Sequence, residues 1–565
     1  MRRLSTSRSA SSRRPETSPA RGRVSIRLTG STALVLFRTS VYCSEEACDP
    51  GHRRAGTHEH DPARNPARSL GRTRMSAHAP DAADTASADT QSASGATQFK
   101  ANLGTGRVAL LVIACAAPLG SVIGNTPIGF TLGNGAGLPI IFLVAGLVLA
   151  CFAAGYVAIN RAVPGGGGFA RYVHAGFGPG AGLGAAYATT LAYGSGTIAI
   201  TAAAGYFADV IAAGHGLHLP WWLYSIVAMV IVGTLGRYAA DLSAKVLLVM
   251  IVAEFAMLIV LDILILSHSG LSALPLDVFS PKQVFSGSVG PALMIAFTSF
   301  IGIESAVIYA NEARNPGKTV PRAIYLCVGV ISVFYFLTVW LIVGSVGVDQ
   351  IVPVTEKAQG DLLFTLSGEQ GGTLLTTLMQ IFFLTSVLAS LVALHNATTR
   401  YLQTMGTQGT MPKFLGTLHA KYQGPARASE ALSVLTAVLV AVFVILGADP
   451  YLGVYTSLGG LFTVGIVAMQ GAVAVTVVVF FRKRKDRRLW KTLVAPAIGA
   501  IGLLTATGLI IANYSVLTGT EDTLPNLLPW TIPLAFVIGL VVYHRRRDLV
   551  VDFDPAPAPT DRAQP

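Results

Sequence analysis

The chain has 565 residues, of which 52% are hydrophobic and only 12% are charged. Soluble globular domains carry roughly 25% charged residues, so this composition excludes an ordinary soluble enzyme and indicates a membrane protein. The formal net charge is +12, from 41 Lys and Arg against 29 Asp and Glu, and we interpret this excess as a topological signal, not as a surface that binds nucleic acid.

The first hundred residues hold 16 of the basic and 9 of the acidic side chains and are rich in Arg, Ser, Ala, Thr and Pro. This composition predicts that residues 1–100 form a disordered cytoplasmic tail. Met75 opens an acidic, Ala/Ser/Thr-rich stretch that leads into the first hydrophobic segment, so we hypothesise that translation starts there and that residues 1–74 are not made. Residues 549–565 are rich in Pro, Ala and Asp, and we expect them to form a second disordered cytoplasmic tail.

Residues 101–548 consist of apolar runs of about 20 residues or more, the length that crosses roughly 30 Å of hydrocarbon. These runs predict an all-α, polytopic membrane domain with about twelve transmembrane helices. The expected spans are 107–132, 137–160, 180–212, 220–240, 243–267, 287–311, 321–347, 371–403, 430–447, 451–481, 490–513 and 526–544.

The positions of Lys and Arg in the short loops predict the orientation of these spans. With the amino terminus inside, the inner connections hold 22 basic residues, whereas the outer connections hold only Lys282 and Lys357. This alternation predicts a multi-pass protein of the cytoplasmic membrane with both termini in the cytoplasm.

The first and sixth spans are interrupted. The first contains Pro118-Leu-Gly-Ser-Val-Ile-Gly-Asn-Thr-Pro-Ile-Gly-Phe130, and the sixth contains Ala296-Phe-Thr-Ser-Phe-Ile-Gly-Ile-Glu304. Unwound backbone is tolerated at membrane depth only where it lines a cavity, and interruptions at corresponding places in two halves indicate a transporter site. The N–H groups freed at such a break suit an anion such as a carboxylate. The alternative is a pair of Pro-kinked helices with close Gly packing.

Two acidic residues lie near the middle of their spans. A rise of about 1.5 Å per residue from the nearest inner basic residue puts Glu304 about 15 Å and Glu254 about 14 Å above the inner interface. A carboxylate at the midplane costs about 2.5 to 3.5 kcal/mol, and removal from water favours its neutral form. We therefore interpret Glu304 and Glu254 as proton-coupling residues; the alternative is that each is a permanently protonated or paired acid that holds helices together.

Two further ionisable residues lie closer to the interfaces. The same count puts Asp262 about 25 Å from the inner interface, near the outer face, and His395 about 8 Å from the inner one. We expect His395 and its neighbour Asn396 to cap or bridge helices, with a transport role as the alternative.

The sequence contains no phosphate-cradling loop, no metal-ligand cluster and no nucleophile and base at membrane depth. Its five cysteines are too few and too scattered for a disulfide framework. We expect no enzymatic activity, no metal and no cofactor, so the energy for transport has to come from an ion gradient or an exchanged solute.

The sixth span and the loop after it carry a long motif. Phe297-Thr-Ser-Phe-Ile-Gly-Ile-Glu-Ser-Ala306 and Asn311-Glu-Ala-Arg-Asn-Pro-Gly-Lys-Thr-Val-Pro-Arg-Ala323 resemble the F-x-x-[FY]-x-G-[FI]-E and E-x-x-N-P-x-[RK]-x-[IV]-P-[RK]-A signature of the amino acid/polyamine/organocation (APC) superfamily of permeases. Two further regions are similar to the family: the loop between helices 2 and 3, Pro164 to Tyr172, and the region after helix 8, which begins at Asn396 to Arg400. The resemblance covers roughly residues 104–548 and implies a five-plus-five inverted repeat with two extra helices, in which helices 1 and 6 are discontinuous around the substrate.

The resemblance also implies a substrate site. In such permeases, backbone N–H groups at the helix 1 break hold the substrate carboxylate, and carbonyls at the helix 6 break hold its amino group. The matching positions here are Ile123, Gly124, Asn125 and Thr126 in helix 1, and Phe297, Ser299, Phe300 and Gly302 in helix 6.

Three positions depart from the family pattern. Many members have G-S-G-I-F in helix 1, where this chain has Gly124-Asn-Thr-Pro-Ile128, so the Asn and Thr side chains narrow or repurpose the carboxylate pocket. Thr298 stands where some members carry a large aromatic gate, which implies room for a bulkier substrate or a different gate. Some proton-coupled members carry a helix 5 Lys in place of a sodium ion; this chain has Glu254 in that region, so sodium coupling stays open.

We therefore predict a secondary active transporter of an amino acid or related amine that is driven by protons and works by alternating access around the midplane site. An amino acid/metabolite exchanger and a sodium-coupled symporter are the alternatives, and a transporter-like ligand sensor is a more distant one. The expected partners are a small-molecule substrate, the coupling ion and the lipid bilayer.

Overall fold

The computed structural model describes residues 104–163, 168–237, 244–305, 316–422, 424–486 and 488–546. Within these ranges the regular structure is helical and contains no strand. The predictions for residues 1–100, including Met75, and for residues 549–565 lie outside the described residues.

Nine helical stretches of the described chain are long and apolar enough to cross a membrane. Two shorter apolar segments, α6 (Trp221–Arg237) and Val289–Ser305, which begins with α9 (Val289–Thr298), occupy the fourth and sixth predicted spans. The first predicted span is occupied by the pair α1 (Thr105–Cys115) and α2 (Pro118–Thr131). Together these elements fill the twelve predicted spans, and the all-α polytopic prediction is confirmed.

The remaining long helices are α3 (Leu138–Ala162), α5 (Pro179–Ala213), α7 (Ala244–Ser269), α10 (Pro316–Val346), α12 (Leu362–Thr407), α13 (Ala426–Ile445), α14 (Thr456–Lys483), α15 (Ala495–Ala512) and α18 (Thr531–Arg545). Short elements connect them: η1 (Gly135–Gly137), α4 (Gly168–Phe177), η2 (Gly270–Ala273), η3 (Leu276–Phe279), α8 (Pro281–Val284), α11 (Ile351–Ala358), η5 (Gln359–Asp361), η6 (Lys413–Gly416), η7 (Pro450–Tyr455), η8 (Trp490–Val494), α16 (Tyr514–Thr518), α17 (Thr523–Asn526) and η9 (Leu528–Trp530).

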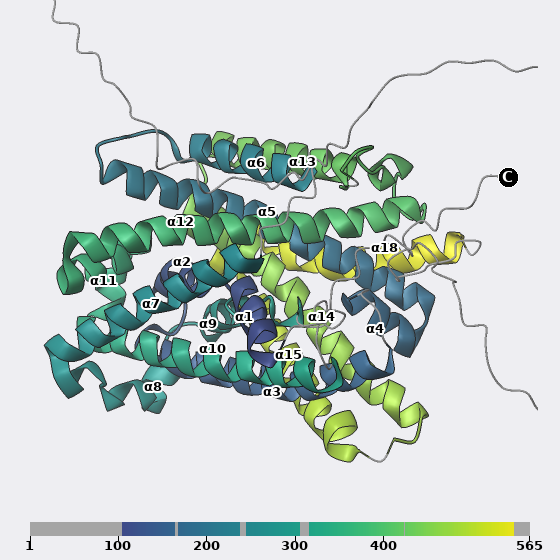
Figure 1. The fold of residues 1–565 in the computed structure, drawn as a ribbon, viewed down its shortest axis with the longest axis horizontal. Coiled ribbons are helices and arrows are strands. Elements are labelled where there is room, and N and C mark those ends of the chain that lie inside the picture. The colour runs from purple at the N-terminus through teal and green to yellow at the C-terminus, as the bar shows by residue number, and fades with distance from the viewer. Residues whose placement is uncertain are drawn as a thin grey trace, which may run out of the picture. The chain divides into compact units, whose positions relative to one another are not determined.

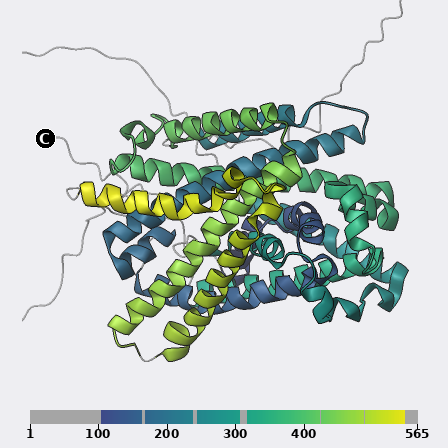
Figure 2. The ribbon, with the colours of Figure 1, turned by 180° about the vertical axis from the view of Figure 1, so that it is seen from behind.

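Helices from the two halves of the domain pack in matching pairs. The second span, α3, packs against the seventh, α10; the third, α5, against the eighth, α12; and the fourth, α6, against the ninth, α13. Figures 1 and 2 show the α6/α13 pair and the α3/α10 pair on opposite sides of the bundle, with α1, α2 and α9 between them. This pairing of each helix with the one five spans later fits the expected five-plus-five repeat.

Small residues allow α5 to lie close to its neighbours. This helix packs against α4, α6, α12, α14 and α18. A Cβ atom built on Gly184 would lie 2.8 Å from the carbonyl oxygen of Phe536, and one on Gly205 would lie 2.0 Å from Oγ of Ser225. Glycines at such contacts let helix backbones approach closely in the membrane, so α5 forms a tightly held centre for the helices around it.

The predicted inner connections lie together at one end of the bundle. Nζ of Lys483, after the tenth span, donates to the carbonyl of Gly176 in α4 (3.2 Å). Nη1 of Arg546, after the twelfth span, donates to the carbonyl of Gly409, after the eighth (2.8 Å). At the other end, η1 packs against α8, η3 and α11, all of which belong to predicted outer connections. The alternation of inner and outer loops along the sequence therefore agrees with the fold.

Candidate functional site

The break in the first span lies at Ala116 and Ala117. Ala117 has φ 42° and ψ 72°, in the left-handed region, and Pro118 follows at the first position of α2. Proline has no N–H to continue the preceding helix but fits the first turn of a new one. Oγ of Ser121 donates to the carbonyl of Ala116 (2.9 Å), which the interruption frees from helical bonding.

This position corrects the predicted one. Ile123, Gly124, Asn125 and Thr126 lie inside α2, well past its first turn, where backbone N–H groups bond to carbonyls within the helix. Their N–H groups are therefore not the free donors that we expected. The physical reason is that α2 accommodates the Pro/Gly-rich stretch as regular helix, including Pro127, and unwinds only before Pro118.

A buried acid lies at the freed start of α2. The N–H of Leu119, in the first turn of α2, donates to Oε2 of Glu254 on α7 (3.2 Å). Glu254 is only 4% exposed. The amino-terminal end of a helix carries a partial positive charge, so the carboxylate is placed where its charge is best stabilised. The sequence indicates the interrupted first span and the buried acid Glu254 separately, but it contains no signal that the two are in contact.

Asn125 connects three spans. Its Nδ2 donates to Oγ of Ser299 in the sixth span (3.0 Å), and its Oδ1 accepts a hydrogen bond from the hydroxyl of Tyr455 in the tenth. The hydroxyl of Tyr451, one turn earlier, donates to the carbonyl of Gly124 (2.8 Å). The first and sixth spans are thus in contact at the residues that the sequence singled out, and the tenth span completes the cluster.

The sixth span unwinds where the sequence predicted. Helix α9 ends at Thr298, and Gly302 has φ 115°, a conformation that favours glycine. Its N–H donates to Oε2 of Glu304 (2.9 Å), and the hydroxyl of Tyr193 on α5 donates to Oε1 (3.3 Å). Glu304 is 9% exposed. Its carboxylate therefore lies inside the protein and is held by the unwound segment itself.

The other predicted residues of the sixth span are in its packed interior. Phe297 and Phe300 are buried, and the Phe300 ring lies 6.2 Å from that of Tyr335 on α10. The hydroxyl of Thr298 shares a hydrogen bond with that of Thr463 on α14. Thr298, at the position where some family members carry an aromatic gate, is therefore hydrogen-bonded to the tenth span.

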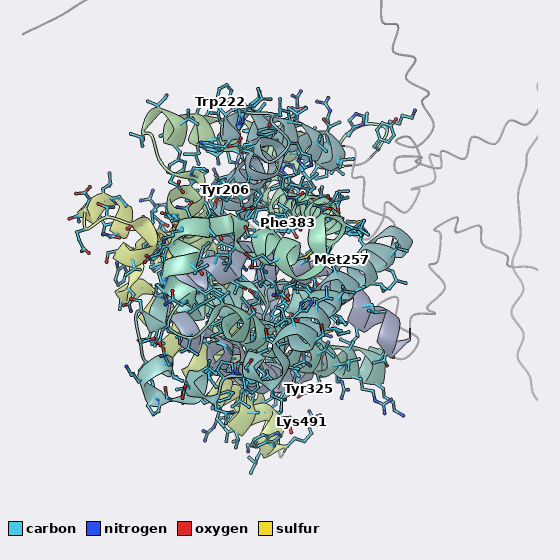
Figure 3. All side chains as sticks on the ribbon, turned by 90° about the vertical axis from the view of Figure 1, so that its left-hand side faces the viewer. Tyr206, Trp222, Met257, Tyr325, Phe383 and Lys491 are labelled. Carbon is cyan, nitrogen blue, oxygen red and sulfur yellow. The ribbon has the colours of Figure 1, made fainter. Side chains whose placement is uncertain are left out.

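A cluster of aromatic rings lies next to Asn125, and the sequence did not predict it. The rings of Tyr206 and Tyr451 stack with centroids 4.7 Å apart and planes 3° apart, and Phe207 packs against both Tyr451 (5.4 Å) and Phe383 (4.6 Å). Figure 3 shows Tyr206 and Phe383 between Trp222, at the top of the view, and Lys491, at the bottom. The cluster joins the third, eighth and tenth spans, and aromatic residues in separate apolar runs give no sign of such a meeting.

A hollow of about 140 Å³ borders this cluster on the side of the outer connections. It is lined by Pro127, Thr131, Leu132, Glu356, Gln359, Tyr451 and Leu452. Tyr451 lines this hollow, and its hydroxyl donates to the carbonyl of Gly124. This residue therefore connects the hollow to the part of the first span that contacts the sixth.

His395 bridges three helices, as the sequence suggested. Its Nε2 donates to Oγ of Ser429 on α13 (2.8 Å), and that hydroxyl donates to the carbonyl of Gly233 on α6 (3.1 Å). The ring is only 3% exposed. This geometry gives His395 a structural role between α12, α13 and α6.

Comparison with known proteins identifies the family. Residues 103–542 match the sequence profile of the amino acid permeases. The chain belongs to this family. The resemblance to APC superfamily permeases is thereby confirmed, and the family consists of transporters, not enzymes. Among the described residues of this permease, no group of three or more His, Cys, Asp and Glu side chains could hold a metal ion.

Several relatives span most of the permease. It is 24% identical over 478 residues to the branched-chain amino acid permease BcaP of Bacillus subtilis, covering 80% of this chain and 94% of that protein. It is 24% identical over 468 residues to the methylthioribose transporter of Bacillus subtilis, covering 78% and 93%. It is 26% identical over 354 residues to the L-asparagine permease of Escherichia coli, covering 58% and 66%.

Proposed function

We propose that this permease is a proton-coupled secondary transporter of an amino acid or related amine in the cytoplasmic membrane. Both termini face the cytoplasm, because the connections rich in Lys and Arg lie together at one end of the fold. Family membership and the names of relatives such as the branched-chain and L-asparagine permeases support an amino acid as substrate.

The observation that carries proton coupling is the position of Glu304. Its carboxyl group lies in the unwound segment of the sixth span, where it accepts from Gly302 and Tyr193, and no Lys or Arg of the described residues forms an ion pair with it. A buried carboxylate without a cation is costly, so the group gains from protonation whenever the site closes to water. Opening to either side returns it to water and releases the proton.

The substrate site lies between the interrupted spans. Asn125 and Ser299 provide an amide and a hydroxyl that meet there, and the hydroxyl of Thr126 is fully buried with no hydrogen-bond partner among the described residues. Carbonyls of Phe297, Ser299, Phe300 and Gly302 lie at or beyond the end of α9. Those of Phe297, Phe300 and Gly302 each accept one backbone N–H, and a carbonyl oxygen has a second lone pair that can accept from an ammonium group. Alternating access follows when the two interrupted spans move against the rest of the bundle.

The test uses purified protein in proteoliposomes and a panel of labelled amino acids and amines. An inward proton gradient drives uptake, a protonophore abolishes it, and Glu304→Gln reduces it by about 100-fold or more, as expected for loss of an essential proton-transfer group. Glu369→Gln, at an exposed position of α12, is the matched control and retains uptake.

Full, pH-independent uptake by Glu304→Gln would remove this residue from the mechanism. Two further arms separate the other modes of transport. Uptake that requires unlabelled solute inside the vesicles identifies an exchanger, and uptake that follows a sodium gradient without a proton gradient identifies a sodium symporter.

A further inference from the structure

Two acids, Glu254 and Asp262, lie on α7, which packs against α10. Glu254, Leu258 and Asp262 follow at intervals of four residues and therefore share one face of the helix. Glu254 and Leu258 are buried and Asp262 is half-buried. The two acids are separated by a rise of about 12 Å along the helix axis, so they lie at two different depths in the membrane.

The outer acid is only partly satisfied. Oγ1 of Thr338 on α10 donates to Oδ2 of Asp262 (2.7 Å). The other carboxylate oxygen, Oδ1, is buried and has no hydrogen-bond partner in the described part of the chain. Asp262 therefore has one oxygen that can accept a proton while the Thr338 hydrogen bond stays in place.

Two buried hydroxyls near Glu254 also lack partners. Tyr335 lies one turn before Thr338 on α10, is fully buried, and interacts electrostatically with Glu254. Ser386 on α12 is also close to Glu254, and a Cβ atom on Gly120 would lie 3.5 Å from its Oγ. Neither hydroxyl has a hydrogen-bond partner within the described ranges.

Buried polar atoms normally have partners, and an unsatisfied one calls for an explanation such as a water molecule or a functional role. Here the unsatisfied atoms of Asp262 and Tyr335 belong to two helices that pack together, α7 and α10, and the unsatisfied hydroxyl of Ser386 belongs to α12, beside Glu254. No Lys, Arg or His of the described chain forms an ion pair with either acid, and Tyr335 is the titratable neighbour that the structure places beside Glu254. The interface thus has the groups of a proton pathway.

We propose that protons reach the transporter from its outer side along the α7/α10 interface, from Asp262 through Thr338 and Tyr335 to Glu254. This inference rests on the proposed proton coupling and adds a route and a second protonation site. A proton from outer water binds the free oxygen of Asp262. The neutral carboxyl and the Thr338 hydroxyl, which donates to Oδ2 in this structure, then turn so that the carboxyl donates its proton to Oγ1 of Thr338. Each hydroxyl accepts one proton on its oxygen and releases its own, so that Glu254 ends neutral and Asp262 regains its charge.

The end of this route is coupled to the break in the first span. Charged Glu254 accepts from the N–H of Leu119 at the positive end of α2. Protonation removes the charge that this helix end stabilises, so it weakens the link between α7 and α2. Ala117, two residues before Leu119, is the non-helical joint between α1 and α2. Protonation of Glu254 therefore loosens a contact that restrains this joint.

The experiment compares two kinds of transport in proteoliposomes that contain a pH-sensitive dye. The probe is the labelled amino acid with the highest wild-type uptake in the panel described above. Net uptake under an inward proton gradient requires a proton to enter with each cycle. Counterflow at equal pH on both sides does not, because the loaded carrier can exchange substrate without releasing its proton.

Asp262→Asn keeps an acceptor for Thr338 but cannot carry the proton, and Tyr335→Phe removes the buried hydroxyl. We expect each to reduce net uptake and dye-reported proton influx by about tenfold or more, with counterflow unchanged. Thr338→Val should behave in the same way and Thr338→Ser should restore net uptake. Asp277→Asn in η3 and Tyr325→Phe in α10, both at exposed positions, are the matched controls and should resemble the wild type.

Three results would overturn the pathway. Wild-type proton influx that persists in Asp262→Asn and Tyr335→Phe excludes the route while leaving proton coupling intact. An equal fall of net uptake and counterflow shows that these residues only support packing. Substrate uptake without any proton influx in the wild type, or uptake that needs sodium ions, rejects the proposed coupling together with the route.

Discussion

Asn125 and Ser299 are 174 residues apart and are joined by a hydrogen bond of 3.0 Å from Nδ2 to Oγ. The other end of the Asn125 amide accepts from the Tyr455 hydroxyl. One buried side chain therefore fixes the first, sixth and tenth spans relative to each other. Neither partner can be lost without leaving a polar atom unsatisfied in the interior.

We expect Asn125→Ala to lower the free energy of unfolding by about 1 to 3 kcal/mol, because it leaves the Tyr455 hydroxyl without its acceptor and opens a cavity. Uptake should be lost even where the protein still folds. Asn125→Asp retains the acceptor for Tyr455 but loses the donor to Ser299, so its thermal stability should lie between those of Asn125→Ala and the wild type.

Thermal unfolding in detergent and uptake per folded molecule measure these effects. Asn513→Ala is the matched control, since Asn513 follows the end of α15 and, among the described residues, its side chain bonds only to the carbonyl of Leu509. Wild-type uptake in Asn125→Ala would show that the link between the spans is not needed for transport.

The conformation of Gly302 leads to a second prediction. With φ at 115°, any other residue at this position is strained by about 1 to 3 kcal/mol. Gly302→Ala should therefore destabilise the protein and disturb the N–H that holds Glu304. We expect reduced uptake together with a changed pH dependence.

A glycine on the neighbouring span provides the control. A Cβ atom on Gly329, in α10, would have no atom within 4 Å, and replacing a helical glycine with alanine stabilises by about 0.5 to 1 kcal/mol. Gly329→Ala should thus unfold at a slightly higher temperature and transport normally. Equal stability of Gly302→Ala and the wild type would contradict the strained backbone at the break.

The two breaks show what sequence can and cannot predict. Long apolar runs predict helices because lipid offers no hydrogen-bond partners to the backbone, and the spans follow directly. The break at Gly302 was predictable because only glycine adopts its conformation easily. The break in the first span was misplaced because Pro118 begins a helix and Pro127 is tolerated inside it. The contact of Leu119 with Glu254 depends on how distant helices pack, which no local pattern records.

His395 gives a third prediction, on stability. His395→Ala removes the donor to Ser429 and a buried ring, at a cost of about 2 to 5 kcal/mol for a large buried side chain. His395→Gln can still donate to Ser429 and should cost less. Both variants should keep the pH dependence of uptake per folded molecule, because the residue joins helices and does not carry the coupling proton. A shifted pH profile in His395→Gln would instead assign it a part in proton transfer.

The orientation of the permease can be tested with single cysteines in a background whose five native cysteines are replaced. Lys357→Cys at the end of α11 and Lys421→Cys in the connection before α13 lie at exposed positions on opposite ends of the fold. Because basic connections stay in the cytoplasm, a membrane-impermeant maleimide added to intact cells should label Lys357→Cys only. Permeabilised cells should label both, which controls for reactivity. Labelling of Lys421→Cys in intact cells would reverse the assigned orientation and place Asp262 on the cytoplasmic side, away from the proton source that drives uptake.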